Sequence, residues 1–208
     1  MLNIINQINS EASALLESNL RSLVQIQSGR YGSGAGTIWH ADGLIVTCAH
    51  VVSRREQSLN VKLSDGRSFP ARLLAKDPSV DLAVLAIEAD GLPAVTLGDS
   101  RSLRPGDWIS ALGHPWGVKG SATSGVVIGV GDDLEEIEGI WRVRRDWIAA
   151  HLHLRPGYSG GPMIDAAGGM VGVNSMMTGP DVGVAVPVHT AKAFLQDVMG
   201  TKRAAVMA

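Results

Sequence analysis

The chain has 208 residues, of which 45% are hydrophobic and 18% are charged, a composition that excludes an intrinsically disordered protein. Its net charge of −2 argues against a nucleic-acid-binding surface, and its single cysteine excludes an intrachain disulfide. No apolar run is long enough to cross a membrane. The first basic residue is Arg21, so the N-terminus lacks the pattern of a signal peptide. We therefore expect a cytoplasmic protein if the chain is complete, and a periplasmic or secreted one if an export signal was removed.

An amphipathic helix is expected over residues 3–20, because apolar side chains recur there at helical spacing. These side chains are Ile4, Ile5, Ile8, Ala12, Leu15, Leu16 and Leu20. Two interpretations of this stripe remain open: the helix packs on its own domain, or it joins copies of the chain. We treat residues 1–20 as a separate N-terminal helix.

Short apolar runs separated by Gly, Asp and Pro predict an all-β fold after this helix. The runs are Leu23–Ile26, Thr37–Trp39, Leu44–Thr47, Val61–Leu63, Leu82–Ile87, Trp108–Leu112, Gly125–Val130, Trp147–Leu154, Met163–Ile164, Met170–Val173 and Val182–Val186. A segment rich in Gly and Pro at residues 89–105 is the expected boundary between two halves. A C-terminal helix is expected at residues 190–199, with Thr190 as its cap and Gly200 as its stop, followed by a tail at residues 201–208.

The segment Arg155–Pro162 places Ser159 among three glycines, at the end of an expected strand. Glycine permits a sharp bend that exposes the Ser159 hydroxyl and lets the N–H groups of Gly157 and Ser159 converge. Two convergent N–H groups can stabilise the oxyanion of an acyl-transfer intermediate. On its own, the segment favours a tight turn between strands, because glycine-rich turns are common.

His50 ends one apolar run, and Asp81 begins another. A serine hydroxyl needs a nearby base, for which histidine is suited, and an aspartate can hold the imidazole in the required tautomer. Asp77 is a competing acid, but Asp77-Pro78 is typical of a turn. Alone, His50 could be a core histidine and Asp81 a cap at a strand end. The order His50, Asp81, Ser159 predicts a catalytic triad.

Several ordered motifs resemble the trypsin-like protease domain of the HtrA/Deg serine proteases, over about residues 20–198. They are Gly34–Gly36, Asp42–Gly43, Thr47–Val52, Asp81–Leu85, Leu112–Pro115, Pro156–Pro162 and Gly183–Pro187. The resemblance implies two packed six-stranded antiparallel β-barrels of the chymotrypsin type within a protease domain at residues 21–200. Barrel one would cover about residues 21–98 and barrel two about residues 106–188.

The same resemblance implies a serine endopeptidase that cleaves unfolded or extended polypeptides through an acyl-enzyme, in HtrA-like protein quality control. It implies no cofactor and no metal, and a homotrimer assembled through the N-terminal segment. It also implies a regulatory role for the charged segment at residues 132–146. Family members usually carry a peptide-binding PDZ domain after the protease domain, which we do not expect here. The alternative is a protease-fold binding or regulatory module whose site never assembles.

Near the expected nucleophile, the sequence departs from the family pattern at two positions. Tyr158 and Cys48 stand where the family usually has Asn, and Cys48 is expected to be a small buried residue. The resemblance places the pocket floor at His153, six residues before Ser159, and one wall at Asn174, Ser175, Met176 and Met177. If His153 turns away, the methionines alone form an apolar pocket, and we expect aliphatic residues before the cut. His151 and His153 lack a third metal ligand, and His114 is expected to be structural.

Overall fold

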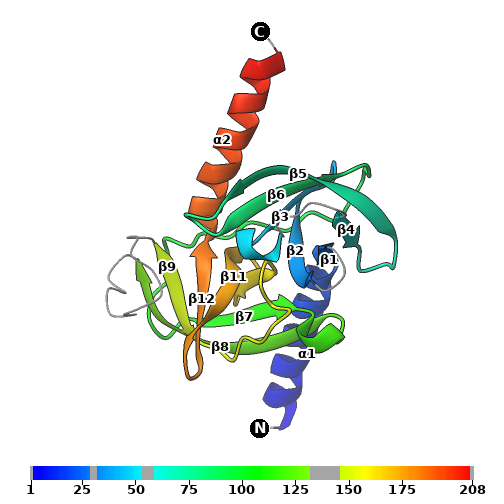
Figure 1. Ribbon diagram of the computed structural model, residues 1–208. Coiled ribbons are helices and arrows are strands. Elements are labelled where there is room, and N and C mark those ends of the chain that lie inside the picture. Colours follow the sequence, from blue (N-terminus) through cyan, green and yellow to red (C-terminus); the bar gives the residue numbers. More distant parts are fainter. Residues whose placement is uncertain (1, 29–31, 53–58, 132–145, 207–208) are drawn as a thin grey trace.

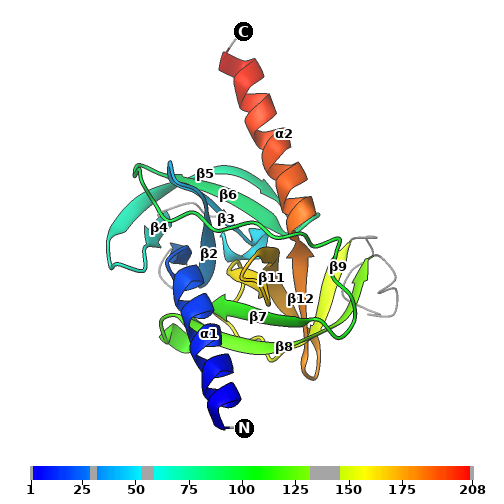
Figure 2. The ribbon, with the colours of Figure 1, turned by 180° about the vertical axis from the view of Figure 1, so that it is seen from behind.

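The computed structural model describes residues 2–28, 32–52, 59–131 and 146–206 (Figure 1). Most of the charged segment at residues 132–146 therefore lies outside the described residues, and its predicted regulatory role stays a prediction. Two closed antiparallel barrels lie against each other, with one helix projecting from each end of the molecule (Figures 1 and 2). The prediction of two packed six-stranded antiparallel barrels is confirmed.

Barrel one closes because its first strand pairs with both the second and the fourth. Its strand order is β1-β2-β3-β6-β5-β4. The strands are β1 (Leu23–Ser28), β2 (Gly32–His40), β3 (Leu44–Thr47), β4 (Leu59–Lys62), β5 (Ser68–Asp77) and β6 (Leu82–Ile87), with the short 3-10 helix η1 (Ala49–Val51) after β3. Its core consists of apolar side chains that alternate along these strands, among them Ile26, Ile38, Ile45 and Leu85.

Barrel two has the strand order β10-β11-β12-β9-β8-β7 and closes through pairing of β10 with β7. Its strands are β7 (Trp108–Gly113), β8 (Ser121–Gly131), β9 (Trp147–His151), β10 (Pro162–Asp165), β11 (Met170–Gly179) and β12 (Val182–Pro187), with the 3-10 helix η2 (Pro115–Gly117) between β7 and β8. A separate apolar cluster joins the barrels, where Val46 and Leu82 of barrel one meet Val173 and Val184 of barrel two. This shared core fixes the cleft between the barrels.

The structure corrects four details of the expected elements. Strand β5 was not predicted, because Pro70, Arg72 and Lys76 interrupt its apolar pattern. Strand β9 ends at His151 rather than Leu154, and β11 continues past Val173 to Gly179. Helix α2 (Val188–Val206) begins before Thr190 and continues through Gly200. One glycine inside a helix costs only about 1 kcal/mol relative to alanine, and the residues that follow Gly200 include helix formers.

Helix α1 (Leu2–Leu20) has two different halves. Leu15, Leu16 and Leu20 pack against a buried cluster that includes Leu23 and Ile164. In contrast, Ile4, Ile5 and Ile8 are between 52% and 63% exposed, on the part of the helix that points away from the barrels (Figure 2). The helix therefore packs on its own domain through its C-terminal half and leaves its N-terminal half uncovered.

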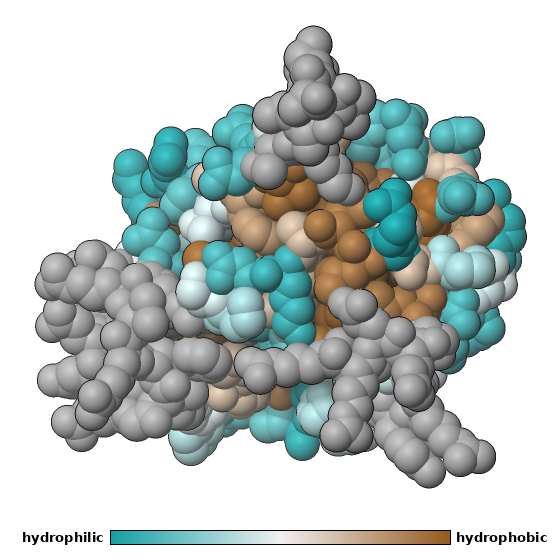
Figure 3. Space-filling model, turned by 45° about the horizontal axis from the view of Figure 1, so that its top comes forward, coloured by the Kyte–Doolittle hydropathy of each residue, from teal (hydrophilic) through white to brown (hydrophobic). Residues whose placement is uncertain are grey.

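An apolar groove runs beside α2 on the outside of barrel one, lined by Trp39, Leu44, Leu97, Leu195 and Met199, among others. Apolar side chains gather on this face below the end of α2 (Figure 3). Among the described helices, none is long and apolar enough to span a membrane.

Candidate active site

His50 and Asp81 meet because their strands are neighbours. Thr47, the last residue of β3, pairs with Ala83 near the start of β6, so the residues after β3 and before β6 lie at one end of barrel one. His50 lies in η1, and Asp81 immediately precedes β6. Asp81 has a positive φ of 54°, a left-handed conformation that aspartate tolerates better than most residues.

The Asp81 carboxylate accepts hydrogen bonds from three directions. His50 Nδ1 lies 3.0 Å from Oδ1 and 2.9 Å from Oδ2, and the His50 backbone N–H donates to Oδ1 at 3.1 Å. The Ser175 hydroxyl donates to Oδ2 at 2.6 Å. Because an ionised carboxylate only accepts, the His50 proton lies on Nδ1 and Nε2 is left free to take up a proton.

The charge of Asp81 is maintained although its side chain is buried. Burial alone would raise the pKa of this carboxyl, but the hydrogen bonds from His50 and Ser175, together with the charge of the imidazolium, hold the pKa below its usual value. Asp81 is therefore ionised at neutral pH. It can keep the imidazole oriented and can stabilise an imidazolium when one forms.

Ser159 lies in the loop between β9 and β10, on the barrel-two side of the cleft. Its carbonyl accepts a hydrogen bond from the Ala35 N–H at 2.9 Å, which ties the loop to barrel one. Gly160 has φ of 89°, and a Cβ there would lie 2.1 Å from the Ala35 carbonyl oxygen. Only glycine fits this bend, which brings Ser159 to the cleft.

The Ser159 hydroxyl donates to the Ser175 carbonyl at 2.7 Å. No hydrogen bond joins the described side chains of Ser159 and His50. The structure thus brings His50 and Ser159 to one cleft, with the buried Asp81 joined to His50 and the serine hydroxyl turned to a backbone carbonyl.

Two backbone N–H groups beside Ser159 are available to a ligand. Those of Gly157 and Ser159 have no hydrogen-bond partner within the described ranges. The Pro156 carbonyl accepts from the Trp116 N–H at 3.4 Å. Because the C=O and N–H of a trans peptide point in opposite directions, the Gly157 N–H points away from Trp116. This arrangement leaves two donors for an anionic oxygen near Ser159.

The cleft has a volume of about 430 Å³ and includes His50, Gly157 and Ser159. Its apolar lining includes Leu154, Met176 and Met177. Leu154 was missed as a pocket residue, although it directly follows the expected floor residue His153. Neighbouring side chains of an extended chain point in opposite directions. If His153 turns away from the cleft, Leu154 therefore points into it, and this alternation could have identified Leu154 from the sequence.

Two residues expected in the substrate pocket do not line this cleft. Strand β9 ends before His153, whose Nδ1 lies 2.5 Å from Asp181 Oδ1 at the turn between β11 and β12. Asn174 is fully buried and donates through Nδ2 to the carbonyls of Leu112 and Pro162. Ser175, Met176 and Met177 do line the cleft, so β11 supplies one wall.

Cys48 and Tyr158 are both buried. Burial, reinforced by the charge of Asp81, raises the pKa of the Cys48 thiol well above its usual value, so the thiol is uncharged. Cys48, His50 and Asp81 form the cluster of potential metal ligands found in the described segments. A neutral thiol and a carboxylate already engaged in hydrogen bonds favour the His50–Asp81 pair over a metal site. The Tyr158 side chain packs in the core of barrel two, and burial raises its pKa.

A match to the family of trypsin-like peptidase domains covers residues 34–173. Among curated proteins, the mitochondrial serine protease HTRA2 of Drosophila pseudoobscura pseudoobscura is 36% identical over 165 residues, which are 79% of this chain and 38% of that protein. A probable periplasmic serine endoprotease, DegP-like, of Halomonas elongata is 39% identical over 148 residues, which are 71% of this chain and 30% of that protein. This chain thus spans less than half the length of these relatives.

Solved structures with the same fold include the HtrA-type protease AlgW with a bound decapeptide. That chain is 26% identical, with a TM-score of 0.78, over 89% of this chain and 66% of its own. A variant of AlgW with a bound tripeptide is 30% identical, with a TM-score of 0.80, over 88% of this chain and 62% of its own.

Proposed function

Because the chain belongs to the family of trypsin-like peptidase domains and is similar to HtrA-type serine proteases, we propose that it is a serine endopeptidase. The observation that carries the proposal is that His50, oriented by Asp81, shares one cleft with Ser159 and with two N–H groups that have no partner among the described residues. No single motif would support this activity as strongly, because the parts come from both barrels.

In the proposed mechanism, the Ser159 hydroxyl first rotates from the Ser175 carbonyl toward His50 Nε2. His50 then takes the hydroxyl proton while Oγ attacks the substrate carbonyl carbon. The N–H groups of Gly157 and Ser159 stabilise the resulting oxyanion. His50 returns the proton to the leaving amine, which releases the first product and leaves an acyl-enzyme that water hydrolyses by the same steps. Asp81 holds the imidazole and stabilises its protonated form.

The proposed substrates are unfolded or extended polypeptides, in a role in protein quality control. The cleft walls support a preference for aliphatic residues before the cut, because Leu154, Met176 and Met177 are apolar and no acidic side chain lines the described cleft. Methionine side chains adapt to varied apolar partners. Basic residues would lack a counter-charge in this pocket.

A homo-oligomer, with a trimer as the first candidate, is also proposed. It is supported by the exposed Ile4, Ile5 and Ile8, whose burial would remove apolar surface from water. Replacing these three isoleucines by serine should lower the mass measured by light scattering to that of one chain. An unchanged mass would show that these three residues of α1 do not form the interface.

One observation favours a second candidate, a catalytically silent binding module: the Ser159 hydroxyl is bonded to Ser175 rather than to His50. Hydrolysis of an unfolded protein substrate separates the two candidates. For the endopeptidase, Ser159→Ala should lower the turnover about 10⁶-fold. The matched variant Ser124→Ala, which removes a hydroxyl bonded to Ser110 on the neighbouring strand, should retain activity. Equal rates for wild type and Ser159→Ala would favour the binding module.

A further inference from the structure

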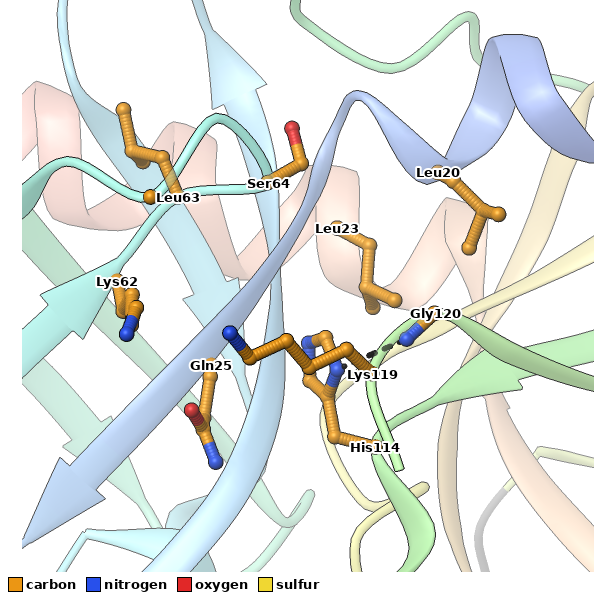
Figure 4. Close-up of a pocket in the computed structure, with 10 residues that line it drawn as sticks. Leu20, Leu23, Gln25, Lys62, Leu63, Ser64, His114, Lys119 and Gly120 are labelled. Atoms are coloured by element: carbon orange, nitrogen blue, oxygen red, sulfur yellow. Dashed lines mark hydrogen bonds between the residues drawn. The ribbon is translucent and has the colours of Figure 1, made fainter. Parts of the chain in front are cut away.

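A second pocket, of about 260 Å³, lies where three segments meet: the end of α1 with β1, the β4–β5 hairpin and the β7–β8 loop (Figure 4). It shares no lining residue with the candidate active-site cleft. Its volume lies just below the range of pockets that hold drug-sized ligands, so its occupant is a smaller molecule.

The two sides of this pocket have different chemistry. Leu20, Leu23 and Leu63 line one part of the pocket, and the amino groups of Lys62 and Lys119 lie in another, with Lys119 running past His114 (Figure 4). None of the ten described lining residues is acidic. In a chain with a net charge of −2, two lysines without an acidic neighbour in the pocket form a local site for an anion.

His114 lies in this pocket as a neutral ring held by its own loop. Its Nδ1 accepts from the Gly120 N–H at 3.2 Å, so the proton of the neutral ring lies on Nε2. Nε2 is buried, beside the Val24 backbone. Burial lowers the pKa of His114; the Val24 backbone opposes this effect, and the charge of Lys119 adds to it. The ring is therefore uncharged at neutral pH.

We propose that this pocket binds a small aliphatic carboxylate, with its hydrocarbon body against the three leucines and its carboxylate between Lys62 and Lys119. An inorganic anion would leave the apolar side unused, and an amine would be repelled by both lysines. A carboxylate bearing a short hydrocarbon chain matches both sides and the volume. Nothing in the proposed proteolytic reaction uses this pocket.

The pocket is linked to the candidate active site through the backbone of its own loop. The His114 N–H donates to the Gly157 carbonyl at 2.8 Å, and the Trp116 N–H holds the Pro156 carbonyl. A Cβ on Gly157 would lie 2.4 Å from the His114 carbonyl oxygen, so the two segments are in close contact. By binding Lys119, the ligand steadies the β7–β8 loop, whose His114 and Trp116 N–H groups hold the carbonyls on either side of the Gly157 N–H. We therefore expect it to raise proteolytic activity, an effect that rests on the proposed function.

Binding is tested first, without reference to catalysis, by calorimetric titration of the full chain with hexanoate. We expect a dissociation constant on the order of 1 mM, typical of such a small ligand. The double variant Lys62→Met, Lys119→Met keeps the apolar stems and should bind at least about tenfold more weakly. Lys192→Met, a matched loss of charge on α2 outside this pocket, should bind like wild type. Equal binding of hexanol, or an unchanged constant in the double variant, would overturn the proposal.

The coupling is tested by peptide hydrolysis at saturating hexanoate. The expected result is at least about a twofold rise in kcat/KM for wild type and none for the double variant, since the ligand acts by favouring one conformation. Binding without any change in rate would overturn the coupling, while the binding site would stand. If the protein cleaves no peptide at all, the proposed function fails, and the calorimetric result still decides the site.

Discussion

The two sides of the candidate active site are held in different ways. On the barrel-one side, Asp81 is joined to the His50 ring, the His50 backbone and the Ser175 hydroxyl, all at 3.1 Å or less. On the barrel-two side, the Ser159 hydroxyl donates one hydrogen bond, to the Ser175 carbonyl. Several hydrogen bonds to the buried Asp81 carboxylate position His50, whereas one hydrogen bond holds the Ser159 hydroxyl.

Ser175 contacts both sides of the candidate site. Its hydroxyl fixes Asp81, and its carbonyl holds Ser159 in the position seen here. In the proposed mechanism, the Ser159 hydroxyl exchanges the Ser175 carbonyl for His50 as its acceptor, and the bond it gives up has a net value of about 1 kcal/mol. We next change the groups that hold His50 and Asp81, from the largest expected effect to the smallest.

Asp81→Asn is expected to have the largest effect. Asparagine tolerates the left-handed backbone at this position, but its amide can donate to His50 Nδ1 and so favours the wrong tautomer. We expect hydrolysis to fall about 10⁴-fold with the fold retained. Asp77→Asn is the matched control, because Asp77 bonds the Ser79 backbone rather than His50. Rates within a few-fold of wild type for Asp81→Asn would contradict the role of Asp81.

Ser175→Ala should have a smaller effect, because it removes one of the donors to Asp81 and leaves the carbonyl that holds Ser159. A hydrogen bond to a charged group is worth about 1.5–3 kcal/mol, so we expect kcat/KM to fall by about tenfold or more. Ser175→Thr keeps the hydroxyl and should recover part of the loss. A threonine variant no better than the alanine variant would show that packing, and not the hydroxyl, matters at this position.

The dependence of stability on acid is the third and smallest expected effect. Because the pKa of Asp81 is lowered in the folded protein, its ionisation stabilises the fold above the carboxyl's unfolded value, about pH 4. That contribution is lost as the pH falls through the folded pKa. Comparing urea unfolding of wild type and Asp81→Asn between about pH 7 and pH 3, we expect the stability advantage of wild type to shrink in acid. A stability advantage of wild type that grows as the pH falls would contradict a lowered pKa of Asp81.

The barrels were predictable from the sequence because short apolar runs and turn residues are local signals. Leu44–Thr47 and Leu82–Ile87 match β3 and β6 as observed. Strand β5 was missed because Pro70 and Arg72 interrupt its apolar pattern. Its exposed residues alternate with residues that are only half-buried. Local propensity is overridden there by pairing on both sides, with β4 and β6.

The candidate site residues His50, Asp81 and Ser159 were named from motifs, and the structure places His50 and Ser159 in one cleft, with the buried Asp81 bonded to His50. Their hydrogen bonds could not be predicted in the same way. Ser175 was expected only as a pocket wall, since its bond to Asp81 spans 94 positions of the chain. His153 was placed at the pocket floor by counting back from Ser159, but the end of β9 and the charge of Asp181 turn it elsewhere.

The central claim is that Ser159 becomes a nucleophile activated by His50 across the cleft. The most direct measurement is the intact mass of the protein after treatment with a fluorophosphonate, which reacts with activated serine hydroxyls. Our account predicts one adduct per chain, located on Ser159 by peptide mapping, and its loss in both Ser159→Ala and His50→Ala. An unlabelled wild-type protein, or labelling of Ser159 that is unaffected by His50→Ala, would contradict it.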